Sequence, residues 1–234
     1  MPSKNKYIYI LLVLLAIGFS LRLSNLSARP LWTDEFYTFF ESSGHGMDVN
    51  DFLSRVSHGE PKLLKAAEFR KFTELDSHKG VMDVARGLLY TDTHPPLYFL
   101  IIYFWGKLLG FSAFTLRLFS LIMGVLSIFL AYKLGCRLFN RDVAACCALF
   151  VSICSFAIRY SQEARAYSLV TVLGLLSWLL ALRLEKNNKN SDALYFSFLN
   201  AAGLYTHYFY AFISVSQFLY FSLVYHKDTT RLRK

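Results

Sequence analysis

The sequence predicts an all-α protein that crosses a membrane several times, and three observations lead to that prediction. Of the 234 residues, 55% are hydrophobic, a share that a soluble domain of this length rarely sustains. Aromatic residues reach 17%, and Tyr and Trp suit membrane interfaces, where one end of the ring meets lipid and the other meets water. The apolar residues also gather into runs near the length of a bilayer-spanning helix, which is roughly 20 residues.

Seven apolar runs are candidates for membrane helices. They cover residues 7–23, 95–109, 113–132, 143–160, 166–182, 193–206 and 208–225. The last two are separated because no charged residue occurs between Ala193 and Tyr225, a stretch too long for one span at about 1.5 Å per residue. A turn near His207 divides it. The first run resembles a signal peptide, but no small-residue cleavage site follows it, so we expect an uncleaved span.

Positive charge sets the expected topology. Basic clusters lie before the first run, after the third, after the fifth and at the C-terminus: Lys4 and Lys6; Lys133, Arg137 and Arg141; Arg183, Lys186 and Lys189; Lys227, Arg231, Arg233 and Lys234. Such clusters stay in the cytoplasm. All four share that side only if one run does not cross, and we expect 95–109, which starts with two prolines, to lie along the outer face. A true crossing by this run is the alternative, because its apolar character is nearly uniform.

The expected fold is therefore a polytopic membrane protein of about six transmembrane helices, with both chain ends in the cytoplasm. Residues 24–112 form one long outer loop with juxtamembrane helices, within a single module of residues 1–234. Within residues 47–92, apolar side chains recur at helical spacing and predict two or three amphipathic helices: Phe52, Leu53 and Val56, and then Leu63, Leu64 and Ala67. The net charge of +9 lies in orienting clusters, so nucleic acid is not an expected partner.

The first polar segment with chemical potential is Leu31-Trp32-Thr33-Asp34-Glu35-Phe36-Tyr37-Thr38, shortly after the first span. Asp34 and Glu35 are carboxylates beside aromatic side chains at the membrane edge, and a carboxylate there suits deprotonation of a hydroxyl. The alternative is that Thr33 or Asp34 caps a helix, whose positive end favours both carboxylates.

The second polar segment is Thr91-Asp92-Thr93-His94-Pro95-Pro96-Leu97-Tyr98. Proline suits the first turn of a helix, and a helix N-terminus offers free N–H groups to a phosphate. His94 would add a donor there or, when neutral, a metal ligand. The alternative is that His94 merely precedes the start of a helix.

The third polar segment is Arg159-Tyr160-Ser161-Gln162-Glu163-Ala164-Arg165-Ala166-Tyr167, between two spans. Polar groups next to spans tend to be functional, and Arg165 offers a planar fork to a phosphate. An ordinary charged turn is the alternative. His207 is expected on the same outer face, where it acts either at the site or simply as a turn residue. The predicted topology places all of these segments on one side of the membrane.

Taken in order, the motifs resemble the membrane glycosyltransferases of the C superfamily. The motifs are W-T-D-E-x-Y-T at 32–38, T-H-P-P-L-Y at 93–98 and Q-E-A-R-x-Y at 162–167, and the segments 114–120 and 206–209 also fit. They are most similar to the family-39-like group, which includes protein O-mannosyltransferases and the aminoarabinose transferase of lipid A.

The resemblance implies transfer of a sugar from a polyprenyl-phosphate donor to a hydroxyl of a lipid, glycan or protein acceptor, usually with inversion. The expected location is the outer, periplasmic face of the inner (plasma) membrane, among membrane lipids. Asp34 is the expected catalytic carboxylate, with Glu35 as a second catalytic candidate. The donor-phosphate candidates are His94, Glu163, Arg165 and Tyr167, followed by His207, Gln162 and Arg117.

Two questions stay open at this stage. No cofactor is required by the motifs, and a divalent metal is possible, since Asp34, His94, Glu163 and His207 have suitable ligand chemistry without a fixed spacing. The alternatives to an enzyme are a lipid or sugar transporter, which would need polar residues in mid-membrane, and an inactive lipid-binding fragment. The fragment is considered because relatives are commonly longer, so that this chain is expected to lack a C-terminal portion.

Overall fold

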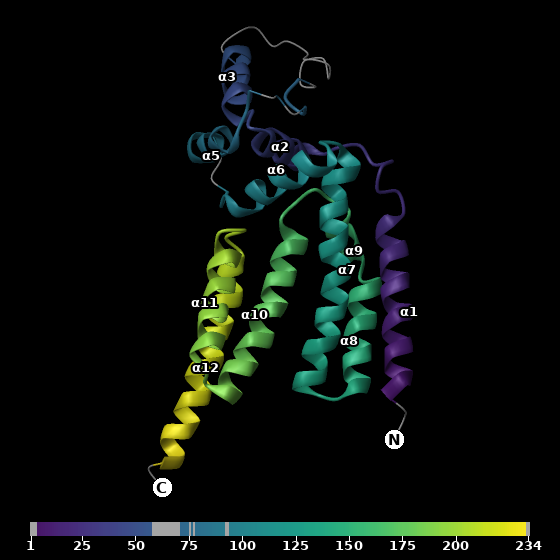
Figure 1. The fold of residues 1–234 in the computed structure, drawn as a ribbon, viewed down its shortest axis with the longest axis vertical. Helices are drawn as coiled ribbons and strands as arrows, with labels where there is room; N and C mark the ends of the chain where they lie inside the picture. The colour runs from purple at the N-terminus through teal and green to yellow at the C-terminus, as the bar shows by residue number, and fades with distance from the viewer. Residues whose placement is uncertain (1–3, 58–70, 75, 77, 92–93, 233–234) are drawn as a thin grey trace.

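The computed structural model of the chain describes residues 4–57, 71–74, 76, 78–91 and 94–232. All regular elements among these residues are α-helices, which confirms the all-α fold class (Figure 1). Their bounds are α1 Lys4–Leu23, α2 Thr33–Ser43, α3 Gly46–Ser57, α5 Val81–Tyr90, α6 Leu97–Leu109, α7 Ala113–Leu138, α8 Arg141–Ile153, α9 Ser155–Ser161, α10 Tyr167–Asn187, α11 Asn190–Leu204 and α12 Tyr210–Leu232.

Three helices of the described chain are long and apolar enough to cross a membrane by themselves: α1, α7 and α10. Helices α8 and α9 make a fourth candidate if they form one span, bent by 57° at a short break. Helix α11 and the apolar part of α12 are shorter. The turn predicted near His207 is present between them, but the count of six crossings stays a prediction.

The basic clusters come together as the predicted topology requires. Figure 1 shows both chain ends, the α7–α8 turn and the α10–α11 turn at one end of the molecule. Helices α2, α3, α5 and α6 lie at the other end, where α9 meets α10 and α11 meets α12. Since side chains near span ends orient a membrane protein, this arrangement separates a basic end from an end that carries the polar motifs.

The long loop between α1 and α7 contains juxtamembrane helices, as predicted. Helix α6 has 13 residues, about 20 Å at 1.5 Å per residue, and Figure 1 shows it lying across the ends of the long helices. Helices α3 and α5 occupy the part where two or three amphipathic helices were predicted. Of that prediction, Leu63, Leu64 and Ala67 lie outside the described residues.

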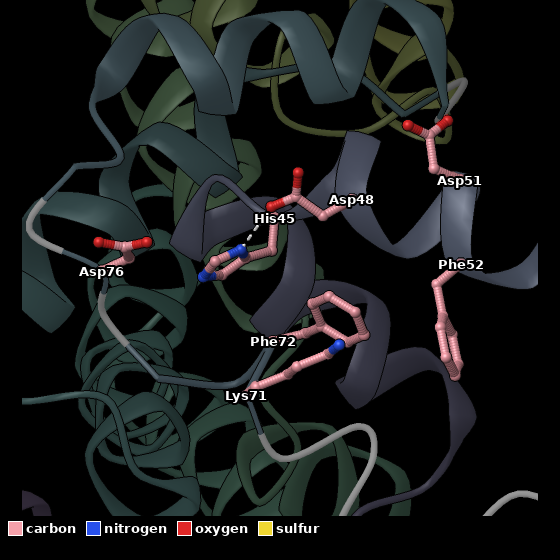
Figure 2. Close-up of a pocket in the computed structure, with 7 residues that line it drawn as sticks. All are labelled: His45, Asp48, Asp51, Phe52, Lys71, Phe72 and Asp76. Atoms are coloured by element: carbon pink, nitrogen blue, oxygen red, sulfur yellow. Dashed lines mark hydrogen bonds and ion pairs between the residues drawn. The ribbon is translucent and has the colours of Figure 1, made fainter.

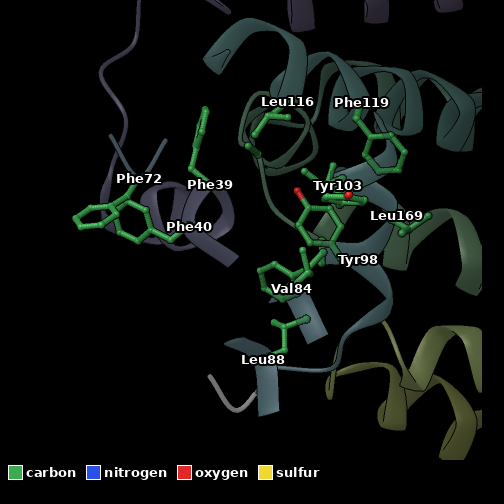
Figure 3. Packing of buried hydrophobic residues seen from close by; sticks show 14 of the residues in the cluster. Phe39, Phe40, Phe72, Val84, Leu88, Tyr98, Tyr103, Leu116, Phe119 and Leu169 are labelled. Atoms are coloured by element: carbon green, nitrogen blue, oxygen red, sulfur yellow. The ribbon is translucent and has the colours of Figure 1, made fainter. Parts of the chain in front are cut away.

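An apolar core joins these outer helices to the bundle (Figure 3). It takes Phe39 and Phe40 from α2, Tyr98 and Ile102 from α6, and Leu116 from α7, all nearly inaccessible to water. Burial of apolar side chains stabilises such a contact by roughly 1.5–3 kcal/mol each. The core therefore fixes α2, which bears the first polar motif, above α7 and α10.

A buried arginine stabilises the break between α8 and α9. The break leaves carbonyl groups at the end of α8 without helical partners. Arg22 of α1 donates to the carbonyl oxygens of Val151 at 2.8 Å and Ser152 at 3.0 Å, and its Nε donates to Ser161 Oγ at 3.1 Å. Gly124 of α7 permits this approach, because a Cβ there would clash with the Ser161 hydroxyl. The third polar motif therefore starts from a fixed position.

Candidate active site

Asp34 and Glu35 lie in the first turn of α2, and neither caps it. The helix begins after Trp32, whose extended backbone occupies the N-cap position without any side-chain cap hydrogen bond. The capping interpretation of Thr33 and Asp34 is therefore wrong. Both carboxylates still lie near the positive end of the helix dipole, which favours their ionised forms.

Asp34 and Arg165 form the exposed part of the site. The Asp34 carboxylate is 38% exposed, and its Oδ2 lies 3.7 Å from Nη2 of Arg165, whose side chain is 7% exposed. Nη1 of Arg165 donates to the backbone carbonyl of Asp34 at 3.1 Å. Ser120 of α7 donates to the carbonyl of Arg165, which holds the loop after α9 against the bundle. A buried cation thus stands beside a carboxylate that solvent can reach.

Glu35 points the other way and forms a buried ion pair with Arg117 of α7. Its oxygens lie 2.8 Å from Nε and 2.6 Å from Nη2 of Arg117, and both side chains are 1% exposed. Oε1 also accepts the backbone N–H of Ala164 at 2.9 Å. This contact joins α2, α7 and the loop that carries Arg165.

The N–H donors of Arg117 are all engaged in hydrogen bonds within the protein. Besides Glu35, its guanidinium donates to the carbonyl oxygens of Leu26, Arg29 and Pro30. These contacts account for all five N–H donors of an arginine. A phosphate would have to displace them, so the geometry favours a positioning role for Arg117 and Glu35 over the catalytic and phosphate-binding roles expected from the sequence.

Gln162 is also engaged within the protein. Its Nε2 lies within hydrogen-bond distance of the carbonyl oxygens of Leu21, Arg22 and Ser24. These carbonyls close the C-terminal end of α1, where backbone acceptors lack helical partners. The side chain therefore fastens the third motif to the first span.

Glu163 lines a different pocket from Arg165. This pocket has a volume of about 240 Å³, and neither Asp34 nor Arg165 lines it. Glu163 accepts a hydrogen bond from Nε of Arg159 at 2.9 Å, and Arg29 and Trp32 also line the pocket. Burial raises the pKa of Glu163, and the nearby Arg159 opposes that shift only in part. The structure thus separates two residues that the sequence interpretation assigned to one phosphate site.

His94, Tyr167 and His207 come together from three distant parts of the chain. The ring of His207 lies 6.3 Å from that of His94 and 5.5 Å from that of Tyr167, measured between centroids. The backbone N–H of Leu97 donates to the carbonyl of Tyr205 at 2.9 Å, which ties the start of α6 to the α11–α12 turn.

His207 is held as a neutral ring. Its Nδ1 accepts the backbone N–H of Phe209 at 3.1 Å, so the ring proton lies on Nε2. Burial lowers the pKa of His207, and its electrostatic interactions with His94 and Arg165 lower it further. The electrostatic effect of Arg165 on His207 connects this histidine cluster with the Asp34–Arg165 pair.

Tyr98 is the last residue of the second motif, but no role was predicted for it. Its hydroxyl is fully buried near Ser120 of α7. Burial raises its pKa, while Arg165 nearby acts in the opposite direction. The available signal was its place one helical turn after His94, in the first turn of α6. The described residues contain no group of three or more His, Cys, Asp and Glu side chains suited to a metal, so they add no support for the divalent metal that the sequence left open.

The comparisons with known proteins agree with the motifs. A family model described as dolichyl-phosphate-mannose-protein mannosyltransferase matches residues 93–234. The matched range contains His94, Arg117, Arg165 and His207, and it leaves out α2 with Asp34. A search of curated proteins and a search of solved structures each found no match. Because the match covers more than half of the sequence, the chain belongs to the dolichyl-phosphate-mannose-protein mannosyltransferase family.

Proposed function

We propose that this protein transfers a sugar from a polyprenyl-phosphate donor to a hydroxyl group of a lipid, glycan or protein acceptor, with inversion, at the outer face of the membrane. One observation carries the proposal: the exposed carboxylate of Asp34 lies beside the buried guanidinium of Arg165. A base that solvent and acceptor can reach thus stands next to a fixed cation. Membership of the family supports glycosyl transfer as the class of reaction.

Asp34 acts as the general base in this proposal. It takes the proton of the acceptor hydroxyl while the hydroxyl oxygen attacks the anomeric carbon of the donor sugar. The bond between that carbon and the phosphate oxygen breaks, and the polyprenyl phosphate leaves with the electron pair. Attack opposite the leaving group inverts the anomeric centre. General-base assistance of this kind typically contributes about 10²–10⁴ in rate.

Arg165 stabilises the charge that develops on the leaving phosphate. Within the described residues it makes one hydrogen bond, to the Asp34 carbonyl, and a longer ion-pair contact with the Asp34 carboxylate, which leaves most of its five N–H donors for a ligand. Arg117 lacks this capacity because its donors are all engaged. Neutral His207 adds an Nε2–H donor near His94 and Tyr167. Fixed donors aimed at developing charge are often the largest single contribution to catalysis.

An apolar pocket beside His94 suits the prenyl chain of the donor. It has a volume of about 650 Å³ and lies between α5, α6 and the α11–α12 turn. Leu88, Leu100, Leu204 and Tyr208 contribute apolar walls. A polyprenyl tail in this pocket would hold its phosphate near the histidines. With the basic clusters in the cytoplasm, this end of the molecule faces the periplasm of an inner membrane.

The test is a turnover assay with membranes that contain the full chain and radiolabelled dolichyl- or undecaprenyl-phosphate sugars, mannose among them. We expect the wild type to transfer sugar and Asp34→Asn to be slower by a factor of at least about 10². Donor binding and expression of the variant should be the same as in the wild type. Asn keeps the shape of Asp but accepts no proton. Turnover by Asp34→Asn near the wild-type rate would refute the proposed base. Donor binding without transfer by the wild type would instead favour a lipid-binding protein.

A further inference from the structure

A third pocket lies in the outer loop, beyond the C-terminal end of α2, whereas Asp34 lies in the first turn of that helix. Figure 2 shows the residues that line this pocket. Its volume is about 490 Å³, and its walls come from α3, from the residues just before α3 and from residues 71–76. None of the candidate catalytic or phosphate-binding residues lines it. The pocket therefore needs an explanation of its own.

His45 is the most constrained polar group of this pocket. It follows Gly44, whose φ of 86° ends α2 in the left-handed region, and its side chain is 8% exposed. Its Nδ1 lies 2.7 Å from Oδ2 of Asp48, and Nζ of Lys79 lies 2.8 Å from the same oxygen. Although burial acts to raise the pKa of Asp48, its contacts with Lys79 and His45 lower it overall. A carboxylate without a proton only accepts, so Nδ1 of His45 carries a proton.

The other nitrogen of His45 is left without a hydrogen-bond partner. Nε2 is buried and has no hydrogen-bond partner among the described residues. Figure 2 shows it pointing away from Asp48, toward the side of the pocket where Asp76 lies. A buried polar atom without a partner is costly, and a ligand that forms a hydrogen bond with it would remove that cost.

The remaining walls combine aromatic and charged groups. The rings of Phe52 and Phe72 lie 5.7 Å apart between centroids, and Nζ of Lys71 lies 4.7 Å from the centre of Phe72. Asp51 and Asp76 add carboxylates. The pocket thus offers hydrogen-bond acceptors, one ammonium donor and aromatic surface to the same ligand.

This combination favours a neutral ligand over a metal ion or an anion. The described residues hold no group of three ligating side chains suited to a metal ion. An anion would meet three carboxylates and one ammonium group, that of Lys71, because the positive charge of Lys79 is directed at Asp48. A compound with several neutral hydroxyl groups meets all the requirements, because a hydroxyl both donates and accepts.

We propose that this pocket binds a neutral sugar unit of the acceptor. One hydroxyl of that sugar forms a hydrogen bond with Nε2 of His45, others donate to Asp51 and Asp76, and Lys71 donates to a further sugar oxygen. The apolar face of the ring packs on Phe52. As a subsite for the acceptor, this inference rests on the proposed glycosyl transfer.

The position of the pocket fits an extended glycan. His45 follows Asp34 by eleven residues, nearly all of them in α2, which corresponds to a rise of roughly 16 Å. A glycan of more than one unit is needed to reach from one residue to the other. The acceptor hydroxyl would then lie at Asp34 while a neighbouring sugar occupies the pocket.

The test measures sugar binding by saturation-transfer NMR on the full chain in phosphocholine nanodiscs, which contain no competing sugar head group. The probes are mannose, glucose, galactose, N-acetylglucosamine and their β-linked disaccharides, with glucose 6-phosphate as an anionic control. We expect at least one neutral probe to bind more tightly than the control. Absence of binding by every neutral probe, or preference for the phosphate, would overturn the proposal.

Two substitutions of His45 separate recognition from structure. The amide of His45→Gln can occupy the place of Nε2, whereas that of His45→Asn can occupy the place of Nδ1 and keep the contact with Asp48. We expect His45→Asn to weaken binding about three- to tenfold and His45→Gln to retain more of it. The reverse order would assign His45 to structure and contradict the proposal.

Asp51→Asn provides a second variant, because Asp51 is exposed and its substitution leaves the packing unchanged. It should weaken sugar binding about threefold without a change in unfolding temperature, and unchanged binding would count against the pocket. Asp34→Asn should bind the probes normally while losing turnover. Sugar binding therefore tests the pocket, and turnover separately tests the proposed reaction.

Discussion

The carboxylate of Glu35 forms a two-point ion pair with the guanidinium of Arg117, with Nε–Oε1 and Nη2–Oε2 distances of 2.8 and 2.6 Å. Both side chains are buried. Its sequence neighbour Asp34 remains 38% exposed beside Arg165. One turn of helix thus presents one carboxylate to the protein and the other to the site.

Substitution of Arg117 should act on stability first. Arg117→Met leaves the buried Glu35 carboxylate without its charge partner, and loss of one member of a buried pair typically costs about 3–5 kcal/mol. We expect a large fall in unfolding temperature, measured by fluorescence in detergent. Arg86→Ala is the matched control, since its ion pair with Asp83 is exposed and should contribute about 0–1 kcal/mol. Equal stability of the two variants would contradict the positioning role.

Substitution of Arg165 should act on donor binding. Arg165→Ala is expected to weaken binding of the polyprenyl-phosphate sugar by roughly 1.5–3 kcal/mol, the usual loss for a charge-assisted hydrogen bond. Arg165→Lys should recover part of it, because lysine keeps the charge and loses the planar fork. The measurement is a binding isotherm in nanodiscs.

Arg159→Ala serves as the control for that experiment. Arg159 lies on the same polar segment, is 62% exposed and pairs with Glu163 in the other pocket. We expect it to leave donor binding nearly unchanged. If Arg159→Ala weakened binding more than Arg165→Ala, the phosphate would belong to the pocket of Glu163.

His207 should make the stability of the protein depend on pH. Because its folded pKa lies below the ordinary value near 6.5, the unfolded chain binds a proton that the folded chain does not. This contribution to stability is complete above about pH 6.5 and is lost as the pH falls toward the lower folded pKa. His207→Asn keeps an acceptor for the N–H of Phe209 and cannot titrate.

Between pH 7.5 and pH 5.5, the unfolding temperature of His207→Asn should therefore fall by less than that of the wild type. His78→Asn, a change at an exposed histidine outside the site, is the control and should follow the wild type. If the unfolding temperature of His207→Asn fell by as much as that of the wild type, other groups would be the cause of the pH dependence.

The six crossings can be tested with single cysteines in a background without native cysteines. We expect Ser54→Cys and Tyr208→Cys to react with an impermeant thiol reagent from outside intact cells, and Asn187→Cys to react only after permeabilisation. Tyr208 lies between α11 and α12, so it reports whether these shorter helices cross. Labelling of Asn187→Cys from outside would refute the topology.

Much of the fold was predictable because membrane insertion depends on local sequence. The lengths of the apolar runs predicted the positions of α1, α7 and α10. The two prolines before α6 indicated that this shorter helix does not belong to the set of spanning helices. The break between α8 and α9 was not predicted, since the apolar run continues through Cys154. It depends on hydrogen bonds from Arg22, more than a hundred residues away.

The site divides in the same way. The sequence by itself determined the three polar segments and, through the basic clusters, their shared end of the molecule. Only the tertiary structure decided that Arg165 faces Asp34 and that Glu163 faces a separate pocket. It also decided that the donors of Arg117 are engaged by Glu35 and by backbone carbonyl groups. The physical reason is that residue type and spacing give the chemistry a side chain can offer, whereas the packing of α2 against α7 and the loop after α9 determines which donors and acceptors remain unused.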